Sequence, residues 1–98
     1  MGMRKIQIFM IVLILLSLCG CFEKKSEADK MNDKGINSFY RGHYEQALTE
    51  FSQAIELDTT DARMFNNRGL VYNTLGDYKN ALADYAQALK LDADFIEV

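Results

Sequence analysis

Apolar side chains recur along residues 28–91 at the three- and four-residue spacing of helices. One face of a predicted helix carries Phe65, Gly69, Tyr72 and Leu75. The next predicted helix carries a stripe formed by Tyr78, Ala81, Leu82, Tyr85, Ala88 and Leu89. Comparable stripes occur earlier in the chain, and the pattern therefore predicts helices over residues 28–41, 44–57, 62–75 and 78–91.

Two glycine pairs separate the helices within each half of this region. Gly42-His43 and Gly76-Asp77 interrupt the apolar periodicity, and glycine followed by a polar residue is typical of a turn. The sequence contains no proline, so nothing forbids uninterrupted helices between these breaks.

The whole pattern repeats after 34 residues. The pairs with identical residues include Gly35/Gly69, Gly42/Gly76, Tyr44/Tyr78, Ala47/Ala81, Leu48/Leu82, Ala54/Ala88 and Leu57/Leu91. A fixed period of this length indicates stacked pairs of helices. Because each repeat contacts mainly its neighbours, such proteins present an extended surface instead of a deep enclosed pocket. The repeat therefore favours a binding module over an enzyme.

Small residues at repeated positions predict close contacts between helices. Gly35 and Gly69 lie in the middle of predicted helices, where glycine costs roughly 1 kcal/mol relative to alanine. A cost that occurs twice at the same position indicates that another helix approaches closely at both places. The alanines of the second helix in each half are seven residues apart and line one side of it.

The residues in these positions resemble the tetratricopeptide repeat, over residues 28–61 and 62–95. This family places in order a bulky residue, a small one, an aromatic, Gly, Tyr, Ala, an aromatic and Ala. The second repeat carries all of them as Phe65, Gly69, Tyr72, Gly76, Tyr78, Ala81, Tyr85 and Ala88. The first carries Met31, Gly35, Gly42, Tyr44, Ala47, Phe51 and Ala54, with Ser38 in place of the first aromatic. The proline common near the repeat's end is absent from both.

This resemblance implies an all-α fold, in which two antiparallel helix-turn-helix repeats form a short solenoid after an N-terminal signal peptide. It also implies a concave groove for a protein or peptide, lined by the first helix of each repeat. The corresponding residues are Asp29, Asn32, Ile36, Phe39, Tyr40, Arg63, Asn66, Leu70, Asn73 and Thr74. Because Ser38 replaces an aromatic, either Phe39 or Tyr40 could instead turn inward and fill the first repeat's core. Asn32 and Ile36 occupy positions where one subfamily has the Lys and Asn of a carboxylate clamp, so no such clamp is expected.

The first 20 residues have the organisation of a secretory signal. Arg4 and Lys5 are followed by an almost wholly apolar run over residues 6–18. An uncleaved membrane anchor is the alternative, although a spanning helix needs about 20 apolar residues and this run is shorter. The sequence therefore favours a cleaved signal at residues 1–20.

The end of this run, Leu18-Cys19-Gly20-Cys21, resembles the lipobox of bacterial lipoproteins. The resemblance implies cleavage after Gly20, lipid on Cys21 and a tether over residues 21–27, with the protein anchored to the bacterial cell membrane. In a cell with two membranes, it favours the outer one, facing the periplasm. The alternative is two ordinary cysteines in a signal core. With Cys19 removed and Cys21 acylated, no cysteine remains for a disulfide or a metal.

Charge and side-chain chemistry argue against several other functions. Without Arg4 and Lys5, nine basic residues face 14 acidic ones, and this excess of acid disfavours nucleic acid as a partner. His43, the only histidine, falls in a predicted turn. Asp84 and Glu50 are expected to face solvent. No catalytic set, cofactor motif or metal cluster is recognisable, so we expect no enzyme activity, no cofactor and no metal.

Solenoids usually need at least three repeats, because the repeats at the ends leave apolar faces uncovered. We therefore expect uncovered apolar residues at the end of this two-repeat solenoid. The residues concerned are Tyr85, Leu89, Leu91, Phe95 and Ile96. Their exposure predicts pairing with a second copy or with another protein. The sequence thus favours a lipoprotein that binds a protein in the cell envelope. The alternatives are an accessory regulator of an envelope enzyme, or a self-associating fragment of a longer repeat protein.

Overall fold

The computed structural model describes residues 25–92 together with Gln7. Residues 25–92 form four α-helices, which are α2 (Glu27–Tyr40), α3 (Tyr44–Leu57), α4 (Ala62–Thr74) and α5 (Tyr78–Leu91). The predicted bounds differ from these by at most one residue, and the described residues contain no strand. The all-α prediction is therefore confirmed. Across the described part of the chain, every helix is too short or too polar to span a membrane.

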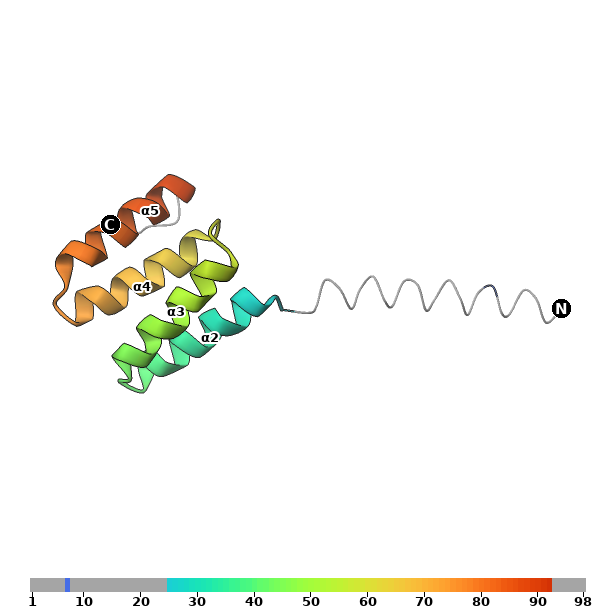
Figure 1. The fold of residues 1–98 in the computed structure, drawn as a ribbon, viewed down its shortest axis with the longest axis horizontal. Helices are drawn as coiled ribbons and strands as arrows, with labels where there is room; N and C mark the ends of the chain where they lie inside the picture. Colours follow the sequence, from blue (N-terminus) through green and yellow to red (C-terminus); the bar gives the residue numbers. More distant parts are fainter. Residues whose placement is uncertain (1–6, 8–24, 93–98) are drawn as a thin grey trace.

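The four helices form two antiparallel hairpins that stack side by side (Figure 1). Helix α3 contacts both α2 and α4, whereas α5 contacts α4 alone among the described helices. Helix α4 also contacts α2, so the first helices of the two hairpins meet along one side of the stack. This arrangement is the predicted short solenoid of two helix-turn-helix repeats.

Glycine closes the turn inside each hairpin by the same geometry. Gly42 and Gly76 have φ values of 81° and 83°, a left-handed conformation that glycine adopts without a Cβ penalty. The amide N–H of the residue after each glycine donates to a carbonyl of the preceding helix, on Ser38 and Tyr72, at 2.9 Å in both repeats. These bonds satisfy carbonyls at the helix end and turn the chain back.

The helix starts differ in their capping. Ser26, Asp61 and Asp77 each accept a hydrogen bond from an N–H in the first turn of α2, α4 and α5. His43 precedes α3 in the place that Asp77 has before α5, and its side chain makes no capping bond. Side chains of the Ser and Asp type accept such bonds well, so α3 is the helix that lacks this stabilisation.

An aromatic ring covers the mid-helix glycine in each repeat. A Cβ atom added to Gly35 would lie 2.6 Å from the ring of Phe51, and one added to Gly69 would lie 2.8 Å from the ring of Tyr85. Real Cβ atoms do not approach other atoms so closely. The predicted close approach of the helices at Gly35 and Gly69 is therefore confirmed.

The core lies mainly between α3 and its two neighbours, in two clusters. One joins Ala28, Ala54, Ile55 and Met64, with Met31 and Phe65 beside it. The other joins Ala47, Phe51 and Val71, with Phe39, Tyr44 and Leu48 beside it. Met64 and Val71 of α4 are fully buried, at 0 % exposure, so α4 contributes to both clusters and binds the two repeats into one unit.

Candidate functional site

Helices α2 and α4 are the first helices of the two repeats, and polar contacts fix their relative register. Arg63 Nη2 donates to Asp29 Oδ1 at 3.1 Å. Farther along the two helices, Asn67 Nδ2 donates to Asn32 Oδ1 at 2.9 Å. These contacts join residues 34 and 35 positions apart. We call the surface formed by these two helices the α2–α4 face.

The α2–α4 face has an apolar end with a small hollow of about 140 Å³. Its lining residues are Ile36, Phe39, Tyr40, Phe51, Asn67 and Leu70. Ile36, Tyr40 and Leu70 are 36 %, 82 % and 42 % exposed, so they are accessible from solvent. Pockets for small molecules usually measure about 300–1,000 Å³. This hollow therefore has room for one apolar side chain of a partner, not for a complete cofactor.

The other end of the α2–α4 face is polar, and its charges are already compensated. Arg63 Nη2 lies 2.6 Å from Asp61 Oδ2, in addition to its contact with Asp29. The hydrogen bonds that Arg63 donates to Asp61 raise the pKa of Arg63 and lower the pKa of the Asp61 carboxyl. Because half of the Arg63 side chain is exposed, this network contributes little stability.

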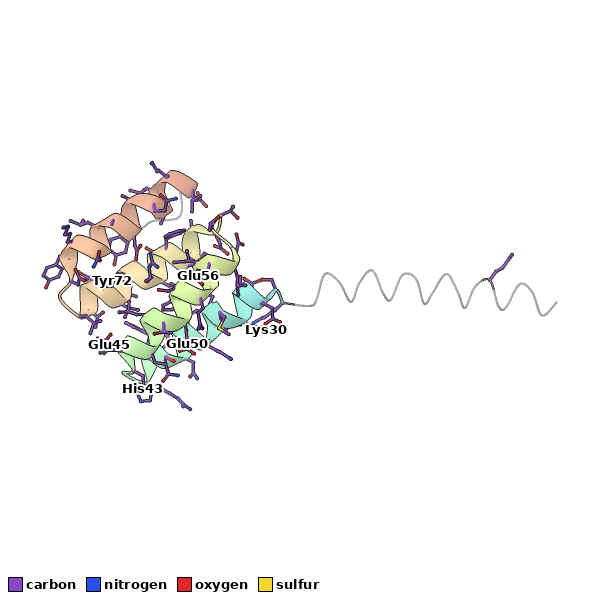
Figure 2. All side chains as sticks on the ribbon, viewed as in Figure 1. Lys30, His43, Glu45, Glu50, Glu56 and Tyr72 are labelled. Carbon is purple, nitrogen blue, oxygen red and sulfur yellow. The ribbon has the colours of Figure 1, made fainter. Side chains whose placement is uncertain are left out.

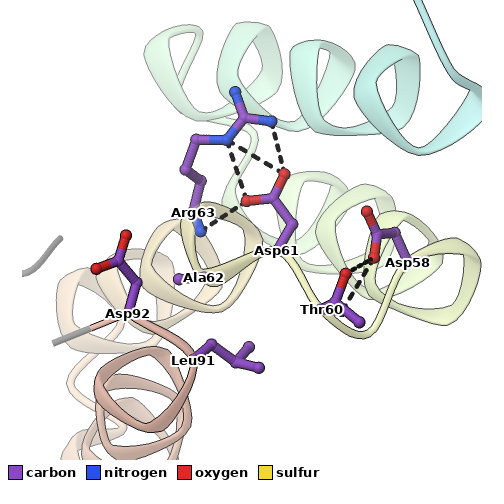
Figure 3. A pocket seen from close by; sticks show the side chains of 7 residues that line it. All are labelled: Asp58, Thr60, Asp61, Ala62, Arg63, Leu91 and Asp92. Carbon is purple, nitrogen blue, oxygen red and sulfur yellow. Dashed lines mark hydrogen bonds and ion pairs between the residues drawn. The ribbon is translucent and has the colours of Figure 1, made fainter.

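Asp61 and Arg63 also border a second, open hollow of about 380 Å³. Figure 3 shows its lining residues, Asp58, Thr60, Asp61, Ala62, Arg63, Leu91 and Asp92. The Thr60 hydroxyl donates to Asp58 Oδ1 at 2.6 Å and thereby lowers the pKa of that carboxyl. Thus the carboxylates of Asp58 and Asp61, in the α3–α4 loop, both accept hydrogen bonds from residues close to them in the sequence. Among the residues that the structure describes, no group of His, Cys, Asp or Glu is placed to hold a metal ion.

The predicted groove residues occupy different environments. Asn32 is buried at 5 % exposure, so it joins α2 to α4 instead of facing a partner. Asn66 is half-buried, while Asn73 and Thr74 are exposed. The Thr74 hydroxyl donates to the carbonyl of Leu70 at 2.9 Å, within its own helix. Asn66 and Asn73 are therefore the groove amides with side chains still accessible.

The structure decides which aromatic residue compensates for Ser38. Phe39 packs against the cluster of Ala47, Phe51 and Val71, whereas Tyr40 is 82 % exposed. Ser38 is itself buried at 5 % exposure, and its hydroxyl donates to Glu50 Oε1. Phe39 thus turns inward beneath the apolar hollow, and Tyr40 stays on its rim.

The expectation that Asp84 faces solvent was wrong. Asp84 is only 5 % exposed, and both its carboxylate oxygens accept hydrogen bonds from Arg68, each at 2.8 Å. The guanidinium also donates to Ser52 Oγ at 3.3 Å, which links α4 to α3. Such bidentate pairing satisfies both carboxylate oxygens inside the protein, and it raises the pKa of Arg68. Asp84 lies on the same helix face as Ala81 and Ala88, and this spacing was the available sequence signal for its burial.

The companion expectation for Glu50 was also wrong, since Glu50 is half-buried and accepts the hydrogen bond from Ser38. The prediction for His43 is confirmed: the ring is exposed at the α2–α3 turn (Figure 2). The predicted lipidation residue Cys21 lies outside the described residues, as do Phe95, Ile96 and all of the predicted signal at residues 1–20 except Gln7.

Comparison with known families supports the interpretation of the repeats. A TPR repeat model matches residues 38–76, and a tetratricopeptide repeat model matches residues 62–95. Together these matches cover residues 38–95, more than half of the chain. No curated protein matches the sequence. Repeats of this kind are interaction modules and are typically not catalytic.

Proposed function

We propose that this chain, a tetratricopeptide repeat protein, binds a protein partner on its α2–α4 face. The expected ligand is a peptide or helix that inserts one large apolar side chain into the hollow beside Tyr40 and Leu70. Asn66 and Asn73 would bind polar groups of the same ligand. An apolar anchor surrounded by hydrogen-bonding groups is the usual composition of such a recognition surface.

The observation that carries this proposal is the hollow itself. Ile36, Tyr40 and Leu70 expose apolar surface around it, although none of them is needed to fill the core. Half-buried Phe39 and buried Phe51 also line it and pack together in the core, so the core fixes the shape of the hollow. A preformed apolar hollow reduces the entropic cost of binding an anchor side chain.

We further propose that the protein is a lipoprotein of the bacterial cell envelope, anchored through Cys21. The Leu18-Cys19-Gly20-Cys21 motif after the apolar run supports this proposal. A Cys21→Ser variant should lose incorporation of an alkyne-bearing fatty acid and should also lose cleavage after Gly20, so that the larger precursor accumulates. A Cys19→Ser variant is the matched control and should keep both. Equal fatty-acid incorporation in the two variants would contradict the assignment to Cys21.

The α2–α4 proposal is tested by crosslinking the protein in its own membrane and identifying what it captures. An Asn66→Ala/Asn73→Ala variant removes the accessible amides, and a Tyr40→Ala/Leu70→Ala variant removes the rim of the hollow. We expect a dominant partner whose capture falls by about tenfold or more in the second variant, because an anchor residue is commonly worth about 2 kcal/mol.

A Gln53→Ala/Glu56→Ala variant is the control, because both residues are exposed on α3 and lie outside the lining of the hollow. It should capture the partner as wild type does. Capture that is unchanged in the Tyr40→Ala/Leu70→Ala variant would overturn the proposed site. The folded state of each variant is checked by circular dichroism before the comparison.

A further inference from the structure

Helix α5 exposes a stripe of large apolar side chains on the side away from α4. Tyr78, Leu82 and Leu89 are 64 %, 68 % and 44 % exposed. They are four and seven residues apart, which places them on one helix face. We call this surface the α5 outer face. Single exposed leucines are ordinary, but an aligned set of them indicates a contact surface.

The first repeat shows how such a face is normally used. Tyr44, Leu48 and Ile55 hold the same positions on α3, 34 residues earlier. Ile55 is 8 % exposed, while Tyr44 and Leu48 are half-buried, because α4 packs against α3. The α5 outer face thus has the composition of a covered helix, yet within residues 25–92 no helix covers it.

The opposite end of the stack does not complement this face. The α4 residues that cover α3 are Met64 and Val71, and their counterparts on α2 are Lys30 and Asn37. Both counterparts are exposed and polar. If α2 of a second copy packed on α5, Asn37 and the ion pair of Lys30 with Glu27 would be buried against apolar side chains, which is costly. Head-to-tail stacking of copies is therefore disfavoured.

Charge further restricts what can cover the α5 outer face. Lys79 and Lys90 directly follow Tyr78 and Leu89, and both lysines are exposed beside the apolar stripe. Neither forms an ion pair with any described residue. The corresponding positions on α3 carry acids, Glu45 and Glu56. The second repeat has therefore reversed the charge along the edge of this face.

A symmetric pair of α5 helices would bring these lysines together. The two lysines lie at similar distances from the middle of α5, so an antiparallel pairing places Lys79 of one copy near Lys90 of the other. Like charges at such positions repel. An acid-flanked helix would instead form favourable pairs with both lysines.

We propose that the α5 outer face binds an amphipathic helix of another chain, whose apolar stripe is flanked by acidic residues. The apolar stripe supplies the contact area, and the two lysines select the partner's charge. The bound helix would pack on α5 as α4 packs on α3. This surface is separate from the α2–α4 face, so the two proposals can fail independently.

The Lys79→Glu/Lys90→Glu variant of the same protein is a suitable probe, because its α5 keeps the apolar stripe and carries acidic flanks. Association is measured between donor- and acceptor-labelled full-length chains in detergent micelles, by fluorescence energy transfer on dilution. We expect an equal mixture of wild type and variant to associate at least about tenfold more tightly than either protein alone. The difference should shrink at high salt because ion pairs are screened.

Two further variants isolate the surface and the charge. Leu82→Asp, a change at a residue that is 68 % exposed, should abolish association of the mixture while the helix content stays constant. Lys34→Glu/Arg41→Glu makes the same charge change on two exposed residues, one in α2 and one directly after it, and it should not associate with wild type above the level of wild type alone.

Two results would overturn the proposal. If wild type alone associates as tightly as the mixture, the occupant is a second copy and the lysines have no selective role. If Leu82→Asp does not weaken association of wild type, of the lysine variant or of their mixture, the α5 outer face is not a docking surface.

Discussion

The two repeats contain the same contact between a glycine and an aromatic ring, in different surroundings. In the first repeat, the Phe51 ring lies on Gly35 and is 2 % exposed, because α4 covers α3. In the second, the Tyr85 ring lies on Gly69 but is only half-buried, because α5 contacts α4 alone among the described helices. Equivalent residues thus contribute differently to stability according to whether another described helix packs over them.

The second repeat has the stronger polar contact between its helices, although its aromatic ring is the less buried one. The first repeat joins its helices by a single hydrogen bond from Ser38 to Glu50. The second places an ion pair at the corresponding position of its second helix, where Arg68 binds both oxygens of Asp84. Helix α5, which no other described helix covers on its outer side, therefore depends more strongly on a charged contact than α3 does.

The largest expected effect is loss of the covered aromatic ring. Phe51→Ala should destabilise the fold by about 3–4 kcal/mol, which matches the whole stability that a core of this size usually provides. Tyr85→Ala should cost about half as much, since its ring is partly in solvent already. Urea unfolding followed by circular dichroism measures both. Equal costs would show that α4 does not shield α3 as described.

The next effect tests the charged contact of the second repeat. Asp84→Ala leaves the half-buried Arg68 without its partner and should cost about 2–3 kcal/mol, at the low end for a broken buried pair because Arg68 keeps some access to solvent. Glu50→Ala removes one hydrogen bond and should cost about 1 kcal/mol. Thermal unfolding compares them. An Arg68→Met/Asp84→Leu variant should recover most of the stability lost in Asp84→Ala, because no unpaired charge remains buried. If it does not, the loss comes from the missing hydrogen bonds and not from the buried charge of Arg68.

A smaller effect compares the two glycines. Gly35→Ala forces a methyl group against the enclosed Phe51 ring, and overpacking of about 1–3 kcal/mol exceeds the gain of about 1 kcal/mol in helix propensity. Gly69→Ala should cost less because the Tyr85 ring can move toward solvent, which leaves only the contact of 3.3 Å with the Ala81 carbonyl oxygen. Chemical denaturation of both variants gives the difference. A greater loss of stability in Gly69→Ala than in Gly35→Ala would show that the Phe51 ring is not the more tightly enclosed of the two.

The smallest effect exchanges the caps of α3 and α5. His43 and Asp77 have similar backbone angles, with φ of −88° and −86°, but only Asp77 caps its helix. His43→Asp should therefore stabilise the protein, and Asp77→His should destabilise it, by about 0.5–1 kcal/mol each. Differential scanning calorimetry at neutral pH resolves shifts of this size. No gain from His43→Asp would indicate that the first turn of α3 is already satisfied by solvent.

The repeat pattern in the sequence predicted most of the fold. Helix bounds followed from the glycine-centred breaks and the apolar stripes, because these local features fix where each helix can begin and end. The close contacts at Gly35 and Gly69 followed from a costly residue occurring twice at one position. Both predictions rest on residue patterns within one repeat, and the second repeat shows the same patterns again.

Contacts between polar side chains could not be predicted in the same way. Asp84 was expected in solvent because carboxylates usually are, and its burial depends on an arginine from another helix. Asn32 was expected in the groove, but the amide of Asn67 holds it between α2 and α4. Phe39 was left open between groove and core, and it packs against the cluster of Ala47, Phe51 and Val71. Each outcome depends on which side chains of neighbouring helices meet, and aligning the two 34-residue repeats does not show these contacts.

Binding of a protein partner to the α2–α4 face can be measured with a photocrosslinking amino acid placed on that face. The residue is incorporated at Tyr40 on the rim of the hollow, and at the exposed Gln53 of α3 as a control. After irradiation of intact cells, we expect one dominant crosslinked protein from position 40 and none from position 53. No crosslink from position 40, or the same products from both positions, would contradict it.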